Sequence, residues 1–408
     1  MTAHWIWLAT RPGMNDRLKR VVLDAFADAE EVYFAQREAY ADIEGITAEA
    51  VDALMDKSLK EAQKILEKCL AKDIRICTYH DEAYPSVLKN IIDPPLVLYY
   101  KGRIPNLEDS PVIGVVGTRK ASSYGLKTAY QMGYQIGRCG GIVVSGAADG
   151  IDAMAMQGAL MAGATVVGVL GCGADRVYPA GNRRLYADTQ LRGCLLSEFP
   201  PGTPPYKWNF PKRNRIMSGL SNGVLVVEAP QISGALITAR AAANQGRDVF
   251  VIPGNIDVDT CVGSNALLRE GAISVSCGWD VVSEYAYLYP DKIRRDATEM
   301  VAPETKNETL KVAQKPAVPE KDRSCDRKKE NKPIDNRPPQ GYSDQSEDLS
   351  ALPTEQLQIL KHLDRECLVA DLIAHMQMPA GKVLGALTML QIRGLVRQLP
   401  GNRVVRIK

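Results

Sequence analysis

The 408-residue sequence has no excess of charge of either sign, because 50 lysines and arginines face 48 aspartates and glutamates. This balance excludes a uniformly basic nucleic-acid-binding protein, so any site for a polyanion has to be a local patch. No apolar run reaches the roughly 18–20 residues that a membrane-spanning helix needs, so we expect no membrane association. Aromatic residues make up only 6% of the chain, which makes any local cluster of them informative.

Cysteine and histidine are few and scattered. The nine cysteines form no CxxC pair, and their odd number and dispersed positions are typical of reduced thiols in a cytoplasmic protein. The four histidines, His4, His80, His362 and His375, all lie outside the middle of the chain. We therefore expect no metal site and no histidine-dependent chemistry in that region.

Composition and apolar spacing divide the chain into four regions. Residues 17–29 and 46–70 show the spacing of amphipathic helices, and we assign 1–105 to a small helical (SAM-like) N-terminal domain with a connector. Residues 106–290 form the second domain. Residues 291–350 hold 13 basic and 13 acidic residues, six prolines and one aromatic. Such a segment cannot bury enough apolar surface to become ordered, which predicts a disordered linker to a last domain at 351–408.

Short apolar runs alternate with helical stretches across residues 106–290. Continuous apolar strands that alternate with helices indicate a parallel sheet covered on both faces, so we predict a doubly wound α/β domain. The predicted strands are 112–116, 142–144, 165–170, 194–196, 224–227, 248–252 and 273–275, and the predicted helices include 124–138, 151–162, 182–191 and 235–245.

The C-terminal region, 351–408, predicts three helices followed by two strands. The helices are 355–363, 369–376 and 380–393, and the strands 395–399 and 403–407 flank the turn signal Pro400-Gly401-Asn402. This is the element order of a winged helix, and the region is mildly basic, with eight lysines and arginines against four acids.

Glycine and hydroxyl residues follow several predicted strands, at the sheet edge where ligands bind in open parallel sheets. Glycine lets the backbone approach a ligand, free N–H groups at a helix start favour an anion, and an arginine can add a bidentate phosphate contact. Tight turns need glycine without any ligand as well, but several such loops on one edge predict a phosphate-bearing ligand. The loops are Gly117-Thr118-Arg119, Ser145-Gly146 and Ser233-Gly234.

The loops match neither GxxxxGK[ST] nor GxGxxG. This absence disfavours a dinucleotide enzyme, and we expect no bound cofactor.

Residues 206–215 contain four basic residues, three aromatics and no acid. Interleaved cations and rings suit single-stranded nucleic acid, because charges follow the phosphates and rings stack on splayed bases. The candidate contacts are Lys207, Phe210, Arg213 and Arg215. In the alternative interpretation Trp208 and Phe210 anchor the core and the charges form a solvated face. Separately, Arg213 and Arg215 could pair with acids inside the fold.

These segments together resemble the DNA-processing protein A (DprA/Smf) family. The matching motifs run in family order across about 180 residues, at 116–120, 145–152, 170–175, 178–182, 197–201, 210–216, 227–229, 233–240, 246–248 and 253–255. The resemblance implies an extended Rossmann-like domain, flanked by a helical N-terminal domain and a winged-helix tail.

The same resemblance implies a function in natural transformation and recombination. It implies that the protein binds and protects incoming single-stranded DNA, forms a homodimer, helps to load the RecA recombinase and has no catalytic residues. It also implies that Arg119, Ser145 and Gly146 contact DNA, with Lys207 on a phosphate and Phe210 near a base.

Two other classes of function stay open. A nucleotide-processing phosphoribohydrolase of the lysine-decarboxylase-like (LOG) group has a similar core, but such enzymes resemble PGGxGTxxE, which is missing around Glu228. A regulator that binds duplex DNA could act through the tail, although helix 380–393 offers few long polar side chains. We expect the tail to contact partners or a second copy at least as often as a DNA groove.

Several acidic residues near the motifs have simpler explanations than chemistry. Asp149 and Asp152 flank a helix start, which favours a capping or first-turn role. Glu228 could be a catalytic carboxylate, but we expect it to be the structural partner of a nearby arginine. Asp175 and Asn182 are expected to hold a loop in place.

Overall fold

The structure is a computed structural model that describes residues 1–294, 354–363, 367–376, 378, 380–392, 395–399 and 403–406. It divides into two compact units, Met1–Lys315 and Pro316–Lys408, which are described separately. The linker predicted at 291–350 lies outside the described residues from 295 onward, and so does the predicted turn at 400–402.

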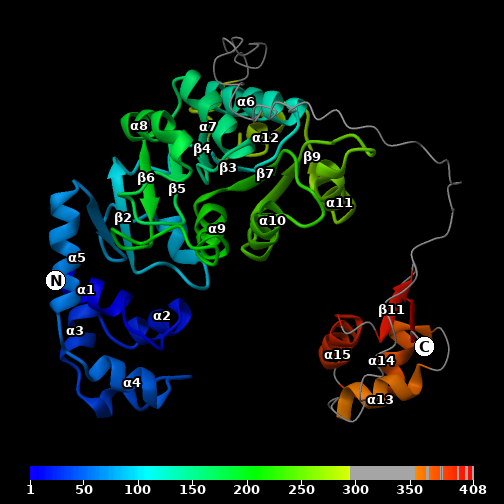
Figure 1. Cartoon of the computed structure of the whole chain (residues 1–408), viewed down its shortest axis with the longest axis horizontal. Coiled ribbons are helices and arrows are strands. Elements are labelled where there is room, and N and C mark those ends of the chain that lie inside the picture. Colours follow the sequence, from blue (N-terminus) through cyan, green and yellow to red (C-terminus); the bar gives the residue numbers. More distant parts are fainter. Residues whose placement is uncertain are drawn as a thin grey trace, which may run out of the picture. The chain divides into compact units, whose positions relative to one another are not determined.

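A nine-stranded sheet runs through the first unit in the order β1-β2-β6-β5-β4-β3-β7-β8-β9 (Figure 1). Strand β2 is antiparallel to β1 and β6, and all the other neighbouring pairs are parallel. The mostly parallel sheet is therefore confirmed. The strands are β1 (Arg75–Thr78), β2 (Val97–Gly102), β3 (Val112–Val116), β4 (Ile142–Ser145), β5 (Val166–Val169), β6 (Cys194–Ser197), β7 (Gly223–Val226), β8 (Asp248–Val251) and β9 (Ile273–Ser274).

Helices cover both faces of this sheet (Figure 1). One face carries α6 (Ser123–Arg138), α7 (Ile151–Met161), α8 (Arg183–Arg192) and α12 (Gly278–Ser283), and the other carries α9 (Asn209–Leu220), α10 (Gly234–Asn244) and α11 (Val262–Arg269). Side chains of β3 alternate between the two layers, since Ile113 and Val115 pack in one core and Val112 and Val116 in the other. The doubly wound architecture is confirmed.

The N-terminal residues form a helical cluster around buried Trp7, Tyr40 and Leu54. Its helices are α1 (Thr2–Ala9), α2 (Asp16–Asp24), α3 (Ala29–Phe34), α4 (Ala48–Met55) and α5 (Lys60–Ala71), with a 3₁₀ turn at Arg37–Tyr40. The chain then enters the sheet as β1 and β2, and β2 pairs with β6. Further 3₁₀ turns lie at Ser86–Asn90, Ala180–Asn182 and Asp259–Cys261.

Helix α9 covers most of the basic and aromatic stretch at 206–215. Trp208 is its N-cap and Pro211 is its third residue. Proline is tolerated there because the first N–H groups of a helix have no partner inside the helix. The helix packs Ile216 and Leu220 into the core, which places its amino-terminal end beside the carboxyl ends of the parallel strands.

The second unit contains α13 (Thr354–His362), α14 (Val369–Met376) and α15 (Ala380–Ile392) and a three-stranded sheet in the order β10-β12-β11. The strands are β10 (Cys367–Leu368), β11 (Val396–Leu399) and β12 (Arg403–Arg406). Ile359, Val383 and Leu390 are fully buried between them. The winged-helix arrangement is confirmed, with β10 as an additional short strand.

The described helices include none that is both long and apolar enough to cross a membrane. Across the same residues, histidine, cysteine and acidic side chains do not gather in a group of three or more that could hold a metal ion.

Candidate nucleic-acid interface

A cavity of about 380 Å³ lies at the carboxyl ends of β3 and β7. From β3 the chain winds outward through β4, β5 and β6, then returns to β7 on the other side of β3. This reversal is the topological switch point at which open α/β sheets bind their ligands. We call this space the switch-point cavity. Its lining includes Gly117, Thr118, Arg119, Phe210, Arg213, Ser233 and Gly234.

Exposed cations and an aromatic ring meet at the edge of the cavity. The guanidinium carbon of Arg119 lies 4.9 Å from the centre of the Phe210 ring, a cation–π contact. Arg119 and Lys120 are both exposed, whereas Phe210 is half-buried. Arg119 and Phe210, which sequence motifs suggested separately, therefore form one surface.

Arg213 supplies a third cation from the buried side of the cavity. It donates a hydrogen bond to the carbonyl oxygen of Val169, and its Nε has no partner among the described residues. Burial lowers the pKa of Arg213, although the nearby Asp152 carboxylate acts in the opposite direction. Burial likewise raises the pKa of Asp152 against the influence of Arg213. Three cations and a single carboxylate thus line the cavity, which favours an anionic ligand.

The glycines of the strand-end loops do not all serve a ligand. A Cβ at Gly117 would lie 2.5 Å from Ile151, and one at Gly146 would lie 2.2 Å from the Arg213 guanidinium. These two positions are glycine because α7 and Arg213 pack against them. Gly234 differs, since nothing lies within 4 Å of its missing side chain and it lines the cavity at the start of α10.

The hydroxyl residues of these loops mainly hold the backbone. Ser145 is buried and donates to the carbonyl oxygen of Val115 at 2.6 Å. Thr118 accepts from the Lys120 N–H at 3.2 Å, and Ser233 caps α10 by accepting from the Ala235 N–H at 3.2 Å. Ser145 and Gly146 are therefore positioned to support the cavity rather than to line it.

Lys207 and Trp208, which come directly before α9, are both exposed. Lys207 is outside the cavity lining, and it lies three residues before Phe210 in the chain. The alternative interpretation of Trp208 as a core anchor is wrong, because this side chain is 65% exposed.

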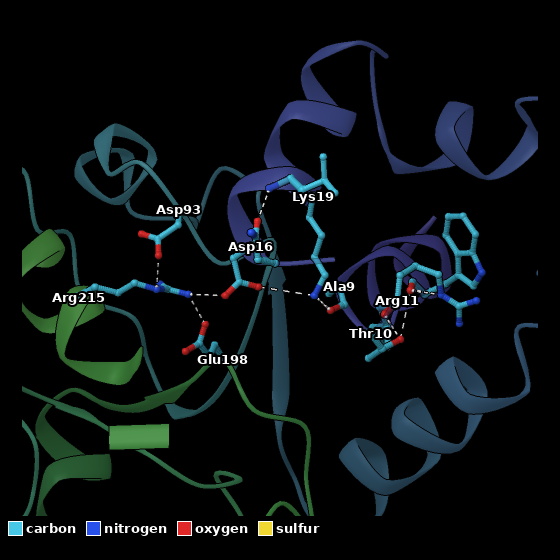
Figure 2. Close-up of polar contacts among 12 residues, drawn as sticks. Ala9, Thr10, Arg11, Asp16, Lys19, Asp93, Glu198 and Arg215 are labelled. Atoms are coloured by element: carbon cyan, nitrogen blue, oxygen red, sulfur yellow. Dashed lines mark hydrogen bonds and ion pairs between the residues drawn. The ribbon is translucent and has the colours of Figure 1, made fainter. Parts of the chain in front are cut away.

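Arg215 points into a cluster of carboxylates (Figure 2), and it is not among the residues that line the cavity. Its guanidinium lies 3.0 Å from Asp93, 3.1 Å from Asp16 and 2.5 Å from Glu198. Burial alone would lower the pKa of Arg215, but the three carboxylates raise it. We therefore remove Arg215 from the candidate contacts, because its Nε and Nη2 pair with carboxylates inside the fold and its Nη1 is buried.

Glu228 has a different structural role from the one predicted. No arginine or lysine pairs with it among the described residues; instead it accepts hydrogen bonds from the N–H and hydroxyl of Ser122, at 3.1 and 3.0 Å, and from the Thr260 hydroxyl. The expected arginine partner is wrong. Glu228 is almost fully buried against Gly125 of α6, and hydroxyl and amide donors satisfy its carboxylate there.

Three other acidic and amide residues hold loops, as expected for Asp175 and Asn182. Asp152 accepts from the Gly146 N–H at 3.1 Å in the first turn of α7. Asp175 accepts from the Gly202 N–H at 2.8 Å and pairs with Lys72. Asn182 donates to the carbonyl oxygen of Ala147 at 3.1 Å.

Sequence analysis missed the position of Tyr178 beside the cavity. Its ring centre lies 5.7 Å from that of Phe210, and its side chain is partly exposed. Its place in the motif at 178–182 could have singled it out, but the motif does not show which way the side chain points.

Comparisons with known proteins agree with this architecture. A family model described as DNA recombination-mediator protein A matches residues 75–286, and one described as DprA winged helix domain matches 343–402. Protein Smf of Synechocystis sp. is 36% identical over 274 residues, which cover 66% of this chain and 69% of that protein. DNA processing protein DprA of Bacillus subtilis is 37% identical over 239 residues, which cover 59% of this chain and 80% of that protein.

A solved structure gives the same result. The X-ray structure of DNA processing protein A from Streptococcus pneumoniae superposes with a TM-score of 0.62 at 35% identity, covering 70% of this chain and 98% of that one. The family match starts at β1, in agreement with the sheet boundary observed here. The chain belongs to the DNA recombination-mediator protein A family, also known as DprA or Smf.

Proposed function

We propose that this protein binds single-stranded DNA in the switch-point cavity and delivers it to a RecA recombinase during transformation and recombination. The observation that carries the proposal is the cavity itself, where Arg119 and Arg213 lie against the Phe210 ring and Lys120 lines the same space at a sheet edge. Cations there would hold phosphates, and the half-buried ring would face a base. Membership of a recombination-mediator family supports the same role.

The binding would have little sequence preference. Phosphates carry no sequence information, and an aromatic ring stacks on any base. The amino-terminal end of α10, capped by Ser233, adds a partial positive charge beside Gly234. Gly117, Thr118, Ser145 and Gly146 would act by shaping the backbone around this site.

The remaining parts of the proposal follow from the family. We propose a homodimer that works in the cytoplasm, contacts RecA and performs no catalysis. The buried Glu228 supports the last point, because its oxygens already accept hydrogen bonds from Ser122 and Thr260. We keep the division into 1–105, 106–290, a linker at 291–350 and a winged helix at 351–408. We assign strand binding to the second of these regions, so that removal of 351–408 leaves it intact.

The test is Arg119→Ala, measured with a single-stranded oligonucleotide, the matching duplex and free nucleotides. A charged hydrogen bond contributes about 1.5–3 kcal/mol, so the variant should bind the single strand at least about tenfold more weakly. If the parent protein neutralises about four phosphates, log affinity should fall with log salt at a slope near −3, and the variant should lose about 0.7 of that slope.

The melting temperature of Arg119→Ala should stay unchanged, because this side chain is exposed. Arg184→Ala is the matched control, since Arg184 is a highly exposed arginine on α8, outside the cavity lining. Unfolding of the Arg119 variant, or a flat salt response of the parent, would overturn the charge argument. Release of free base from nucleoside monophosphates would support the LOG-type enzyme instead.

A further inference from the structure

Tyr206 and Trp208 form an exposed stacked pair at the start of α9. Their ring centres are 4.6 Å apart with planes inclined by only 11°, and their exposed fractions are 44% and 65%. Tryptophan is usually largely buried, so a ring left this exposed needs an explanation. Tyr206 covers one face of the indole, and no other aromatic contact to Trp208 occurs among the described residues. The exposed fraction therefore indicates a flat apolar surface that is open to solvent.

The backbone beneath this pair is held firmly. Asn209 is buried, and its side-chain amide donates to the carbonyl oxygens of Gly171 at 3.0 Å and Pro204 at 3.3 Å. The Tyr206 N–H donates to Pro204 at 2.9 Å, and the Asn209 N–H donates to Tyr206 at 3.0 Å. Stacking on Tyr206 further restricts the indole. An exposed ring that is already ordered loses little conformational entropy when a ligand covers it.

The pair lies close to the switch-point cavity along the chain. Phe210, which lines the cavity, follows Trp208 by two residues, so their Cα atoms are at most about 7 Å apart. That span is comparable to two base steps of a stacked strand, at about 3.4 Å each. Lys207, which lies between Tyr206 and Trp208 in the chain, is exposed and can hold a phosphate next to them. A strand leaving the cavity at Phe210 would meet a cation and a flat ring in the next few ångströms.

We propose that the Tyr206–Trp208 pair is a second base-stacking platform, which takes a base of the same strand whose phosphates occupy the switch-point cavity. This inference rests on the proposed function. The favoured occupant is nucleic acid because the neighbouring exposed side chain is a cation and the surface continues from a cavity lined by three more, Arg119, Lys120 and Arg213. The platform lengthens the bound segment beyond the cavity without adding sequence preference.

The experiment uses the fluorescence of Trp208 in the full chain. The chain has four tryptophans; Trp5 and Trp7 are buried, and Trp279 is partly buried on α12. Titration with an oligothymidylate of about twelve nucleotides, within the usual site size, should quench the emission. Trp208→Phe should abolish that quenching yet bind within about threefold of the parent, because phenylalanine still stacks.

Trp208→Ala should bind the same oligonucleotide about 5- to 150-fold more weakly, the range expected for loss of one stacked base. Tyr287→Ala, which removes an exposed aromatic outside the cavity lining, is the control and should bind like the parent. Rescue by phenylalanine separates stacking from a local distortion of Lys207 and Phe210.

The outcomes separate this inference from the proposed function. If the parent binds the oligonucleotide without a change in its tryptophan emission, and Trp208→Ala binds equally well, the platform is refuted while the proposed function stands. If Trp208→Phe and Trp208→Ala are equally impaired, the ring does not act by stacking and the platform is also refuted. If the parent does not bind the oligonucleotide at all, the proposed function fails first.

Discussion

Two arginines of helix α9, two residues apart, have opposite surroundings. A helix turns by about 100° per residue, so Arg213 and Arg215 point in nearly opposite directions. Arg213 faces the switch-point cavity with one carboxylate, Asp152, close by. Arg215 binds three carboxylates from three separate segments (Figure 2). An arginine surrounded by more acids than it can neutralise belongs to the fold, whereas one with a single acid leaves positive potential for a ligand.

The cluster around Arg215 also connects parts of the first unit that are distant in sequence. Asp16 comes from α2, Glu198 follows β6, and Lys19 joins the cluster by pairing with Asp16 at 3.6 Å (Figure 2). Burial raises the pKa of Glu198, and Arg215 opposes that change. The side of α9 that carries Arg213 thus faces the ligand site, whereas the side that carries Arg215 stabilises the fold.

Arg215→Ala should have the largest effect, and the effect should be on stability. Removing the cation leaves the buried Glu198 carboxylate beside two other acids, and breaking a buried pair in this way costs about 3 kcal/mol. Urea denaturation should show this loss in the free energy of unfolding. The fraction that remains folded should bind single-stranded DNA with nearly the parent affinity.

An effect of Arg215→Ala on DNA binding instead of stability would contradict this assignment. If Arg215→Ala kept its stability and lost DNA binding, Arg215 would contact DNA, as the sequence motif first suggested. Arg184→Ala, which removes an exposed arginine on α8, controls for the loss of one positive charge.

Asp152→Asn should have a smaller effect, and the effect should be on binding. Asparagine can still accept from the Gly146 N–H, but it removes the single carboxylate from the cavity. Less repulsion of phosphates should tighten single-strand binding about threefold, which corresponds to about 0.7 kcal/mol. Weaker binding by this variant would mean that Asp152 is needed to position Arg213.

The same residue gives a pH dependence with a defined sign. Burial raises the pKa of Asp152, so protonation begins at a higher pH than for an ordinary aspartate. Protonation removes the repelling charge, and therefore affinity should rise as the pH falls towards the raised pKa of Asp152, above the range in which an ordinary aspartate titrates. Because its pKa is raised in the folded state, protonated Asp152 also favours folding. This contribution to stability is fully present below the pKa of an ordinary aspartate and is lost as the pH rises through the raised pKa of the folded protein. Asp152→Asn should abolish this pH dependence of binding, and an unchanged pH profile would contradict the assignment.

Much of the fold was predictable because the parallel strands are short, continuous apolar runs. The runs at 112–116 and 142–144 coincide with β3 and β4 within one residue. Strand β1 was missed because Arg75–Thr78 is short and half polar, and it is a strand through its pairing with β2. Helix α9 was missed because Pro211 and a dense run of charge interrupt its apolar spacing.

The site was predictable only in part, because helix α9 was not predicted. Loops after neighbouring parallel strands must meet at one edge, so Arg119 and Ser233 could be expected together. Without helix α9, however, the directions of Arg213 and Arg215 were undetermined. The partner of Arg215 on α2 is 199 residues away in the chain, and no local pattern indicates such a contact.

Asp16→Asn should have a small effect on stability, and it gives the sharpest test of the cluster. Asp16 is partly exposed, and Arg215 keeps Asp93 and Glu198, so we expect a loss of only about 0.5–1 kcal/mol in the free energy of unfolding. Asp24→Asn on the same helix, where the acid pairs with the more exposed Arg20, should change it less. In an Arg215→Ala background the Asp16→Asn loss should shrink or become a gain, because Asp16 would then keep only its pair with Lys19 and would repel Glu198. If the two losses simply add, Asp16 is not coupled to Arg215, and the cluster does not hold the N-terminal helices to α9.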